Sequence, residues 1–523
     1  MVKAAHRYEV VETMSQPRIA GARYHFIGAG GVGMSGLARF LLEKKAVVSG
    51  SDQTSGAATA RLSRLGADIH VGHSAENLRP DTDTVVISAA IRENNPELQV
   101  ARQRGCHIYK YAQFLGELMN SFDGIAISGT HGKSTTTGWL VYCLKQAGLD
   151  VNFVVGADSA QLGGSSGSGD SELFVAEACE YDHSFQNLKP RMTCILNIER
   201  DHLDCYKNED DIVESFYQFA RGTRPDGLIV ANGHDPNVAR VVERLRGTVP
   251  SSVGSVSRTA SSVGRGGLAP PEPAGTEVGG ASPTLQPPTA ISPSIVTFGL
   301  DGGCDFYAAN IGQTNGYYHF DIFQGGQKLG ATRISLPGLH NVFNATAVVA
   351  LAVSLGVEPE RVLDGLGGFQ GMDRRLMLKG QFGGIAVIDD YAHHPTKVKA
   401  SLRAVRERYQ PQRLWCVFQA HQYSRTQSLL EEFAASFGDA DKVLIPEIFA
   451  ARDTEASRQA VSARILADRI RERGADAQYL ASFGAVCDCL EQNVRAGDVV
   501  VTMGAGDVWK VADEYIQRLR RNQ

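Results

Sequence analysis

The sequence predicts an α/β protein of three domains, because short apolar strands alternate with helix-like segments along most of its length. Two glycine-rich segments, at residues 28–33 and 129–132, each follow such a strand and precede a helix. This order is typical of parallel, doubly wound sheets with a ligand at the strand ends. A chain of 523 residues is long enough for about three such domains. We expect an N-terminal Rossmann-like domain, a central P-loop ATPase-like parallel sheet and a C-terminal Rossmann-like domain.

The first domain, residues 1–121, contains a loop of the dinucleotide-binding type. Its apolar strand at residues 24–27 is followed by four glycines: Gly28, Gly30, Gly31 and Gly33. A second strand ends at Asp52, 19 residues after the last of these glycines. In such loops the glycines let the backbone approach a pyrophosphate, and the acid accepts a hydrogen bond from a ribose hydroxyl. Taken alone, the loop favours an NAD-dependent dehydrogenase, or else glycines that serve only helix–strand packing.

The second domain, residues 122–371, begins with a phosphate loop after the apolar residues 124–127. The loop residues are Gly129, Thr130, His131, Gly132, Lys133, Ser134 and Thr135. The usual pattern has a glycine six positions before the lysine, where this chain has Ile127. The glycines present still allow close backbone approach, while the lysine reaches the outer phosphates and the serine hydroxyl binds Mg²⁺. We therefore predict that this loop binds ATP or GTP.

Two polar residues end strands that lie near the phosphate loop in the predicted sheet. Glu177 ends the strand at residues 173–177, and His202 follows the strand at residues 192–197. Since the carboxyl ends of parallel strands face the ligand crevice, these side chains could bind a second Mg²⁺. Mg²⁺ prefers oxygen ligands, so a structural role for His202 is the simpler interpretation from the residues alone.

One segment of the second domain differs strongly in composition from the rest of the chain. Between residues 251 and 293 the chain is rich in Ser, Gly, Ala, Thr and Pro, with seven prolines from Pro270 to Pro293. No periodicity survives there, so we expect a disordered, solvated insertion.

The third domain, residues 372–523, alternates strands and helices again, with strands at residues 385–389, 414–418, 442–445 and 498–502.

The composition is that of an ordinary globular protein, with 43% hydrophobic residues, 21% charged residues and a net charge of −5. Such a chain gives no reason to expect binding to nucleic acid. No apolar run approaches the ~20 residues of a membrane span, and we expect no signal peptide. Nine cysteines without a CxxC pair favour free thiols in the cytoplasm.

Several blocks of this sequence together resemble the Mur ligase family, and within it the members that add alanine. These blocks are residues 28–38, 48–52, 128–136, 197–204, 339–344, 389–395 and 418–426. The resemblance implies ATP-dependent amide formation between L-alanine and the carboxylate of UDP-N-acetylmuramate, through an acyl phosphate, in peptidoglycan precursor synthesis. It also implies ATP and Mg²⁺ as cofactors and a cytoplasmic monomer or homodimer. The expected partners are small molecules, with no nucleic acid and no membrane insertion.

The resemblance assigns roles to individual residues. The catalytic residues it implies are Lys133, Glu177, His202, Arg375 and Asp390. The metal ligands it implies are Ser134, Glu177 and His202. The residues it implies for ATP binding are those of the phosphate loop, together with Asn341 and Asn344. The UDP-sugar is expected at the four N-terminal glycines, Asp52 and His73. The amino acid is expected at His394, His421 and Arg425.

Two departures from the family pattern bear on the amino acid. The family usually has Pro-His-Arg where this chain has Ala420-His421-Gln422, so a cation is missing near the expected alanine pocket. Tyr181 is closer to the related ligase that attaches a recycled tripeptide to the same sugar nucleotide. That ligase is the first alternative and requires a roomier C-terminal pocket. An NAD-dependent dehydrogenase is the alternative from another class, although it leaves Lys133, Glu177 and His202 without a role.

Overall fold

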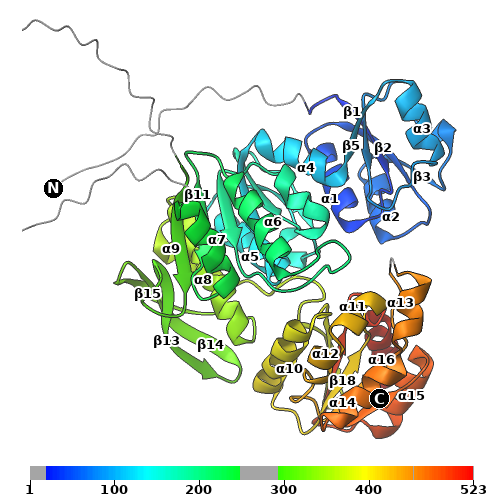
Figure 1. The fold of residues 1–523 in the computed structure, drawn as a ribbon, viewed down its shortest axis with the longest axis vertical. Helices are drawn as coiled ribbons and strands as arrows, with labels where there is room; N and C mark the ends of the chain where they lie inside the picture. The colour runs from blue at the N-terminus through cyan, green and yellow to red at the C-terminus, as the bar shows by residue number, and fades with distance from the viewer. Residues whose placement is uncertain (1–18, 248–291, 452, 522–523) are drawn as a thin grey trace, which may run out of the picture.

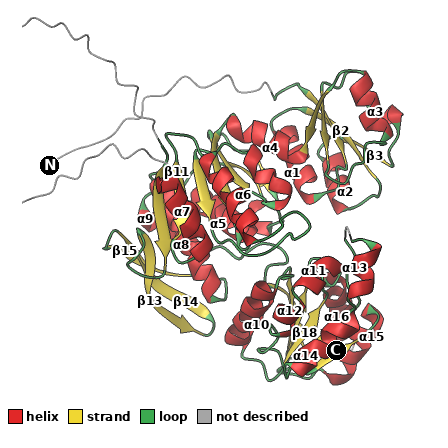
Figure 2. Ribbon diagram, viewed as in Figure 1, coloured by secondary structure: helices red, strands yellow, loops and turns green. Residues whose placement is uncertain are grey.

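The computed structural model describes residues 19–247, 292–451 and 453–521. These residues form three α/β domains in chain order, each built on its own sheet (Figure 1). Helices cover the sheets, as the alternation of segments predicts (Figure 2). The expected insertion at residues 251–293 lies outside the described residues, apart from its last two positions.

The N-terminal sheet is parallel throughout and has the strand order β3-β2-β1-β4-β5. Its strands are β1 (Arg23–Ile27), β2 (Val47–Asp52), β3 (Asp68–Val71), β4 (Thr84–Ile87) and β5 (His107–Lys110). Its helices are α1 (Val32–Glu43), α2 (Ala57–Arg64), η1 (Ala75–Asn77), α3 (Pro96–Gln103) and α4 (Tyr111–Asn120). The strand order reverses between β1 and β4, so the glycine loop after β1 lies at the switch point where such sheets bind ligands. The Rossmann-like prediction is confirmed.

The central sheet has ten strands in the order β15-β14-β13-β12-β11-β10-β6-β9-β7-β8. The first six are β6 (Asp123–Ser128), β7 (Asn152–Val154), β8 (Ser166–Gly167), β9 (Leu173–Glu177), β10 (Met192–Ile195) and β11 (Leu228–Asn232). The others are β12 (Ser294–Gly299), β13 (Phe306–Thr314), β14 (Tyr317–Gln324) and β15 (Gln327–Arg333). Its helices are α5 (Lys133–Gln146), η2 (Ala160–Leu162), η3 (Tyr181–Asn187), α6 (Glu209–Arg221), α7 (Pro236–Gly247), α8 (Leu339–Ser354) and α9 (Pro359–Leu366). The pairings among β6, β7, β9, β10, β11 and β12 are parallel, as predicted, while the short edge strand β8 pairs antiparallel with β7.

An antiparallel ribbon extends the central sheet beyond the strands that the sequence predicts. Strand β14 pairs antiparallel with both β13 and β15. The two connecting turns, Asn315-Gly316 and Gly325-Gly326, have φ values between 51° and 85°. Positive φ at both central residues is the geometry of two-residue type I′ hairpins, which favour Asn-Gly and Gly-Gly. These dipeptides were therefore a sequence signal for the ribbon, and the alternation of strands and helices does not reveal it.

The C-terminal sheet has the order β16-β17-β21-β18-β19-β20, parallel except for the antiparallel edge strand β16. Its strands are β16 (Met377–Phe382), β17 (Ile385–Asp390), β18 (Leu414–Phe418), β19 (Lys442–Ile445), β20 (Ala477–Tyr479) and β21 (Val499–Met503). Its first helices are α10 (Pro395–Tyr409), α11 (Tyr423–Ser428), α12 (Leu430–Ala434) and α13 (Glu455–Ala460). The last three are α14 (Ala463–Glu472), α15 (Phe483–Asn493) and α16 (Trp509–Arg521).

The two junctions between domains differ in chemistry. The N-terminal and central domains share one apolar core, in which the ring of Phe40 packs against Phe122 and Phe174 at centroid distances of 6.3 and 5.4 Å. The C-terminal domain meets the central domain through polar contacts, chief among them the ion pair of Arg425 with Asp201. Since interfaces of this polar kind permit relative motion, the C-terminal junction is the one suited to opening and closing.

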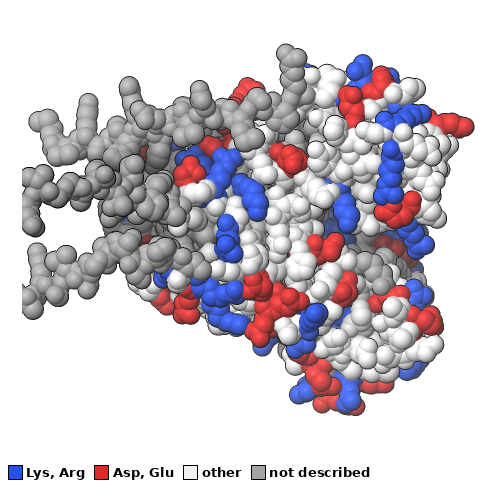
Figure 3. Space-filling model, turned by 45° about the horizontal axis from the view of Figure 1, so that its top comes forward, with Lys and Arg blue, Asp and Glu red and all other residues white. Residues whose placement is uncertain are grey.

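The distribution of charge on the surface and the hydropathy of the helices agree with the composition. Basic and acidic side chains are interspersed over the face shown in Figure 3, with no broad patch of one sign. Within the described ranges, no helix is both long enough and apolar enough to cross a membrane. All nine cysteines are free thiols.

Candidate active site

The phosphate loop connects β6 to α5, and its two glycines have the left-handed backbone that such a turn needs. Gly129 has a φ of +142° and Gly132 a φ of +84°. A Cβ atom on Gly132 would lie 2.8 Å from Oδ1 of Asn344, and one on Gly129 would lie 2.9 Å from Cβ of Leu196. Both glycines are therefore needed for conformation and for space. The contact also places the start of α8 beside the loop, where Asn341 and Asn344 were expected.

Asn197, at the end of the neighbouring strand, fixes the middle of the loop. Its side-chain carbonyl accepts a hydrogen bond from the backbone N–H of His131 at 2.7 Å, and its amide donates to the carbonyl of His131 at 3.1 Å. Its own backbone carbonyl accepts from the N–H of Thr130 at 3.0 Å. Sequence reasoning treated Asn197 only as the first residue of a motif and missed this supporting role.

Lys133 is held by a carboxylate that sequence reasoning overlooked. Its ammonium group donates to both carboxylate oxygens of Glu180, at 3.0 and 2.7 Å. Although burial alone would lower the pKa of Lys133, the charge of Glu180 raises it above its ordinary value. In turn, Lys133 and His202 lower the pKa of Glu180 to about 2, against the effect of burial. Glu180 lies three residues after Glu177 in the same acidic run, and that spacing was the available signal.

The three predicted metal ligands surround this lysine. Glu177 accepts a hydrogen bond from the N–H of Gly156 at 2.9 Å, and its charge also acts on Lys133. Nε2 of His202 lies 3.4 Å from Oε1 of Glu180, and its Nδ1 is buried without a hydrogen-bond partner. His202 has a φ of 54°, which is uncommon outside glycine. Such strained residues concentrate at functional sites, which favours a functional over a merely structural histidine.

Arg375 extends toward the phosphate loop from the start of the C-terminal domain. Its guanidinium donates to the hydroxyl of Ser134 at 3.3 Å. The carboxylate of Asp390 accepts hydrogen bonds from the N–H groups of Leu376 and Ala392, both at 2.7 Å. Burial raises the pKa of Asp390, and Arg375 opposes that shift. Asp390 thus acts on the site by holding the backbone next to Arg375.

The residues expected at the amino acid lie where the C-terminal domain meets the central one. Arg425 donates to Oδ1 of Asp201 from two of its nitrogens, at 3.0 and 2.8 Å, and a third nitrogen lies 3.3 Å from Nδ1 of His421. Although burial alone would raise the pKa of Asp201, Arg425 holds it well below its ordinary range. Gln422 is buried, and its amide donates to the carbonyl of Ala451 at 3.2 Å.

Lys397 is a further buried cation that sequence reasoning did not single out. It lies in the first turn of α10, two residues after Pro395. Burial lowers its pKa to about 8; the charge of Asp201 opposes this shift, whereas the charge of nearby Lys133 adds to it. The motif around His394 was the available signal, because it places this lysine three residues, about one helical turn, after His394.

In the N-terminal domain the glycine loop and Asp52 support each other. Oδ2 of Asp52 accepts a hydrogen bond from the N–H of Gly30 at 2.8 Å. A Cβ atom on Gly33 would lie 2.6 Å from the ring of Tyr111, so this glycine is required for packing. Nδ1 of His73 lies 2.9 Å from the hydroxyl of Ser51, at the end of β2. The structure therefore brings the loop, Asp52 and His73 to the same end of the sheet.

Comparison with known proteins agrees with this arrangement domain by domain. Residues 23–123 match the family described as "Mur ligase family, catalytic domain", residues 127–263 match "Mur ligase middle domain", and residues 374–506 match "Mur ligase, glutamate ligase domain". The UDP-N-acetylmuramate–L-alanine ligase of Clostridium novyi is 38% identical over 496 residues, covering 95% of this chain and 97% of the relative. The ligase of the same name from Acetivibrio thermocellus is 37% identical, covering 94% and 95%.

Solved structures show the same fold. The UDP-N-acetylmuramate–alanine ligase of Thermotoga maritima superposes with a TM-score of 0.73 at 24% identity, covering 96% of this chain and all of that one. A murein peptide ligase of Psychrobacter arcticus superposes with a TM-score of 0.64 at 23% identity, covering 95% and 99%. Three matched domains in order, with relatives aligned over nearly the whole length, establish that this chain belongs to the Mur ligase family.

Proposed function

We propose that this protein is an ATP-dependent ligase that joins the amine of L-alanine to the carboxylate of UDP-N-acetylmuramate. The observation that carries the proposal is the contact of Arg375 with Ser134, at 3.3 Å. It brings a cation from the C-terminal side onto a phosphate loop, in a chain 38% identical to a ligase of that name. A dehydrogenase would have no use for this arrangement.

The chemistry explains why such a site is needed. A carboxylate is a poor acyl donor, because it is negatively charged and lacks a leaving group. Transfer of the γ-phosphoryl group from ATP to a carboxylate oxygen forms an acyl phosphate and releases ADP. The neutral amine of alanine then attacks the acyl carbon, phosphate leaves, and the nitrogen loses one proton as the amide forms. The first step gathers several anionic oxygens, so cations and N–H donors fixed in advance lower its barrier.

The residues around Lys133 fit Mg²⁺ as the expected ion. Ser134 and Glu177 supply oxygen atoms, the donors that Mg²⁺ prefers, and His202 offers an Nδ1 atom that is buried without a hydrogen-bond partner. Ser134, Glu177 and His202 would hold the ion, which when bound offsets the charge of the phosphate oxygens. Lys133 would bind the outer phosphates, while Glu180 keeps its ammonium group charged and oriented.

In this proposal each domain binds a different substrate. Residues 1–121 bind the UDP-sugar through the glycine loop, Asp52 and His73. Residues 122–371 bind ATP, and residues 372–523 bind the amino acid near His394, His421 and Arg425. This division is supported by the position of each group at the carboxyl ends of its own sheet, where α/β sheets bind ligands.

The test is phosphate release by the purified protein with Mg²⁺-ATP and UDP-N-acetylmuramate, in parallel with L-alanine, glycine, L-serine and the tripeptide. The proposal predicts release that depends on L-alanine, together with the mass gain of one alanine residue on the sugar nucleotide. Release with the tripeptide alone would assign the protein to the recycling reaction instead. Release with glycine or L-serine at rates close to that with L-alanine would show that Gln422 leaves the pocket permissive.

A further inference from the structure

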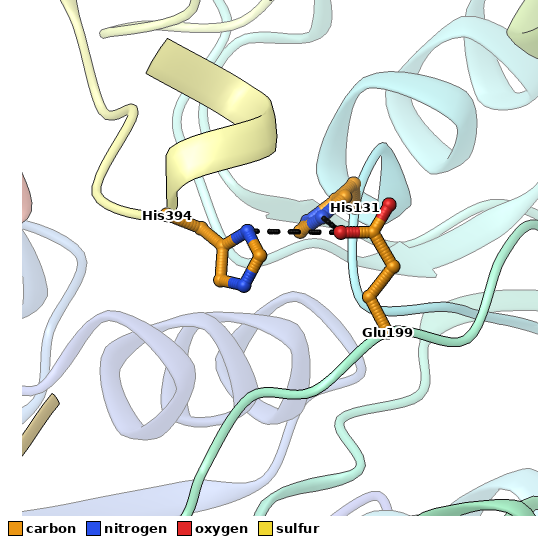
Figure 4. Close-up of side chains that lie close together, drawn as sticks. All are labelled: His131, Glu199 and His394. Atoms are coloured by element: carbon orange, nitrogen blue, oxygen red, sulfur yellow. Dashed lines mark hydrogen bonds and ion pairs between the residues drawn. The ribbon is translucent and has the colours of Figure 1, made fainter. Parts of the chain in front are cut away.

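Three side chains from two domains converge on one point beside the phosphate loop. The reaction outlined above gives these three side chains no joint role. His131 and Glu199 come from the central domain, and His394 lies at the start of α10 in the C-terminal domain (Figure 4). Nε2 of His131 lies 3.1 Å from Oε2 of Glu199, and Nδ1 of His394 lies 3.7 Å from the same oxygen. The three ligand atoms all lie within 4.8 Å of one another.

The hydrogen bond on the far side of His394 fixes which nitrogen faces this point. Nε2 of His394 lies 2.9 Å from the backbone carbonyl of Arg200, which can only accept a hydrogen bond. Nε2 therefore carries the proton, and in the neutral ring Nδ1 presents a lone pair to Glu199. This Nδ1 is buried without a hydrogen-bond partner, and His394 is only 5% exposed. A lone pair aimed at a carboxylate oxygen is repulsive unless a cation lies between the two.

The surroundings favour the neutral imidazoles that bind metals. Burial, with a smaller contribution from Lys397, lowers the pKa of His131 to about 4, and burial also lowers the pKa of His394. Glu199 remains ionised because, against the effect of burial, the hydrogen bond with His131 lowers its pKa to about 2. The contact of His394 with the carbonyl of Arg200 is the kind of outer hydrogen bond that orients metal-binding histidines.

We propose that His131, Glu199 and His394 form a binding site for a transition-metal dication of the Zn²⁺ class, distinct from the Mg²⁺ ligands at the nucleotide. Two imidazoles with one carboxylate are a typical ligand set for Zn²⁺, whereas Mg²⁺ prefers ligand sets made of oxygen atoms. Ligand atoms in a tetrahedral Zn²⁺ site lie about 3.4 Å apart, which the distances of 3.1 and 3.7 Å bracket. Because the ligands belong to two domains, the bound metal draws the domains together.

The proposed consequence is control of domain movement. His131 belongs to the phosphate loop, while His394 caps α10 of the domain that has to separate for substrates to enter and leave. A metal bound to both holds the domains closed and slows exchange of substrates. Zn²⁺ is therefore expected to inhibit reversibly, and a chelator is expected to restore activity.

The experiment uses Co²⁺, which reports four-coordinate binding through intense visible absorption bands, on the full-length protein without nucleotide. A second cluster, formed by His234, Asp301 and Cys304, could also bind Co²⁺. All measurements are therefore made in a His234→Ala, Cys304→Ser background. One equivalent of Co²⁺ is expected to bind, to be displaced by Zn²⁺ and to be unaffected by a large excess of Mg²⁺.

Substitutions then locate the metal. Glu199→Gln and His394→Gln are each expected to weaken Co²⁺ binding at least tenfold, while circular dichroism verifies that each variant is folded. Thr396→Val is the matched control, because Thr396 donates to Oε2 of Glu199 at 2.7 Å but is not a ligand in the proposed site. Co²⁺ binding unchanged in His394→Gln, or abolished in Glu177→Gln, would overturn the proposal, the latter by placing the metal at the nucleotide ligands.

Discussion

The environment of Lys133 shows how a buried lysine can keep the positive charge that it needs to bind phosphate. Its side chain is only 13% exposed, and the carboxylate of Glu180, whose side chain is 3% exposed, lies 2.7 Å from the ammonium group. A lone buried lysine tends to lose its proton, but here the carboxylates of Glu180 and Glu177 raise its pKa. The site thus keeps a full positive charge in a buried position, where its effect on a phosphate is stronger than at the surface.

Lys133→Ala is expected to lower kcat by about 10²–10⁴, because the charge that stabilises the transferring phosphoryl group is removed. Steady-state phosphate release with all three substrates measures the effect. Lys145→Ala is the matched control, since Lys145 lies near the other end of α5, where it makes a 4.0 Å ion pair with Asp150 and lies 5.1 Å from the ring centroid of Phe153. A variant at position 133 that turns over like the control would refute the role of this lysine.

At the scale of elements, sequence patterns located the strands and loops of the site well. The predicted phosphate loop lies between β6 and α5, and Arg375, which the resemblance makes a catalytic residue, contacts Ser134 of that loop. The supporting residues Asn197, Glu180 and Lys397 were missed, because their roles depend on which strand ends become neighbours in the sheet. The ribbon of β13, β14 and β15 was missed for a different reason, since strand–helix alternation was given more weight than the turn dipeptides.

Another element-scale feature is a buried polar network behind the N-terminal glycine loop. Glu97, at the start of α3, is fully buried and accepts hydrogen bonds from the hydroxyl of Ser51 at 2.6 Å and the amide of Asn77 at 2.7 Å. Nε2 of His25 lies 3.1 Å from the same carboxylate. Against the effect of burial, these contacts lower the pKa of Glu97 from 4.5 to about 2. The network joins α3 to the neighbouring strands β1 and β2 and to η1.

Glu97→Gln is expected to destabilise the N-terminal domain by about 3 kcal/mol at pH 7. The folded pKa lies below the unfolded one, so the contribution of Glu97 is complete above pH 4.5 and is lost as the pH falls toward 2. Denaturant unfolding at several pH values should therefore show a difference from wild type that narrows below pH 4.5. Glu76→Gln, on the exposed neighbouring turn, is expected to show no such trend. A difference independent of pH would contradict the account.

At the scale of the whole molecule, the main feature is the contrast between the two junctions that connect the domains. The N-terminal and central domains share buried aromatic rings and so move as one. The C-terminal domain is joined by mostly polar contacts, among them the buried pair of Arg425 with Asp201, with 6% and 3% of the side chains exposed. We expect closure of this domain to bring Arg375 to the nucleotide and to exclude water from the acyl phosphate.

Arg425→Met is expected to loosen this junction, because it leaves the Asp201 charge buried without its partner, at a cost of about 3–5 kcal/mol. Small-angle X-ray scattering should then show a larger radius of gyration than for the wild-type protein. Arg406→Met is the matched control, because Arg406 pairs with Asp441 inside the C-terminal domain, at 2.6 Å. Identical scattering from the two variants would show that the pair does not hold the domains together.

The central claim, activation of a carboxylate by ATP, is tested most directly with UDP-N-acetylmuramate labelled with oxygen-18 in its carboxylate. After turnover with Mg²⁺-ATP and L-alanine, the released phosphate is analysed by mass spectrometry. An acyl phosphate predicts that each phosphate carries one labelled oxygen, because the substrate oxygen leaves with phosphorus when the amine attacks. Phosphate without label, formed at the same rate as the product, would contradict the account.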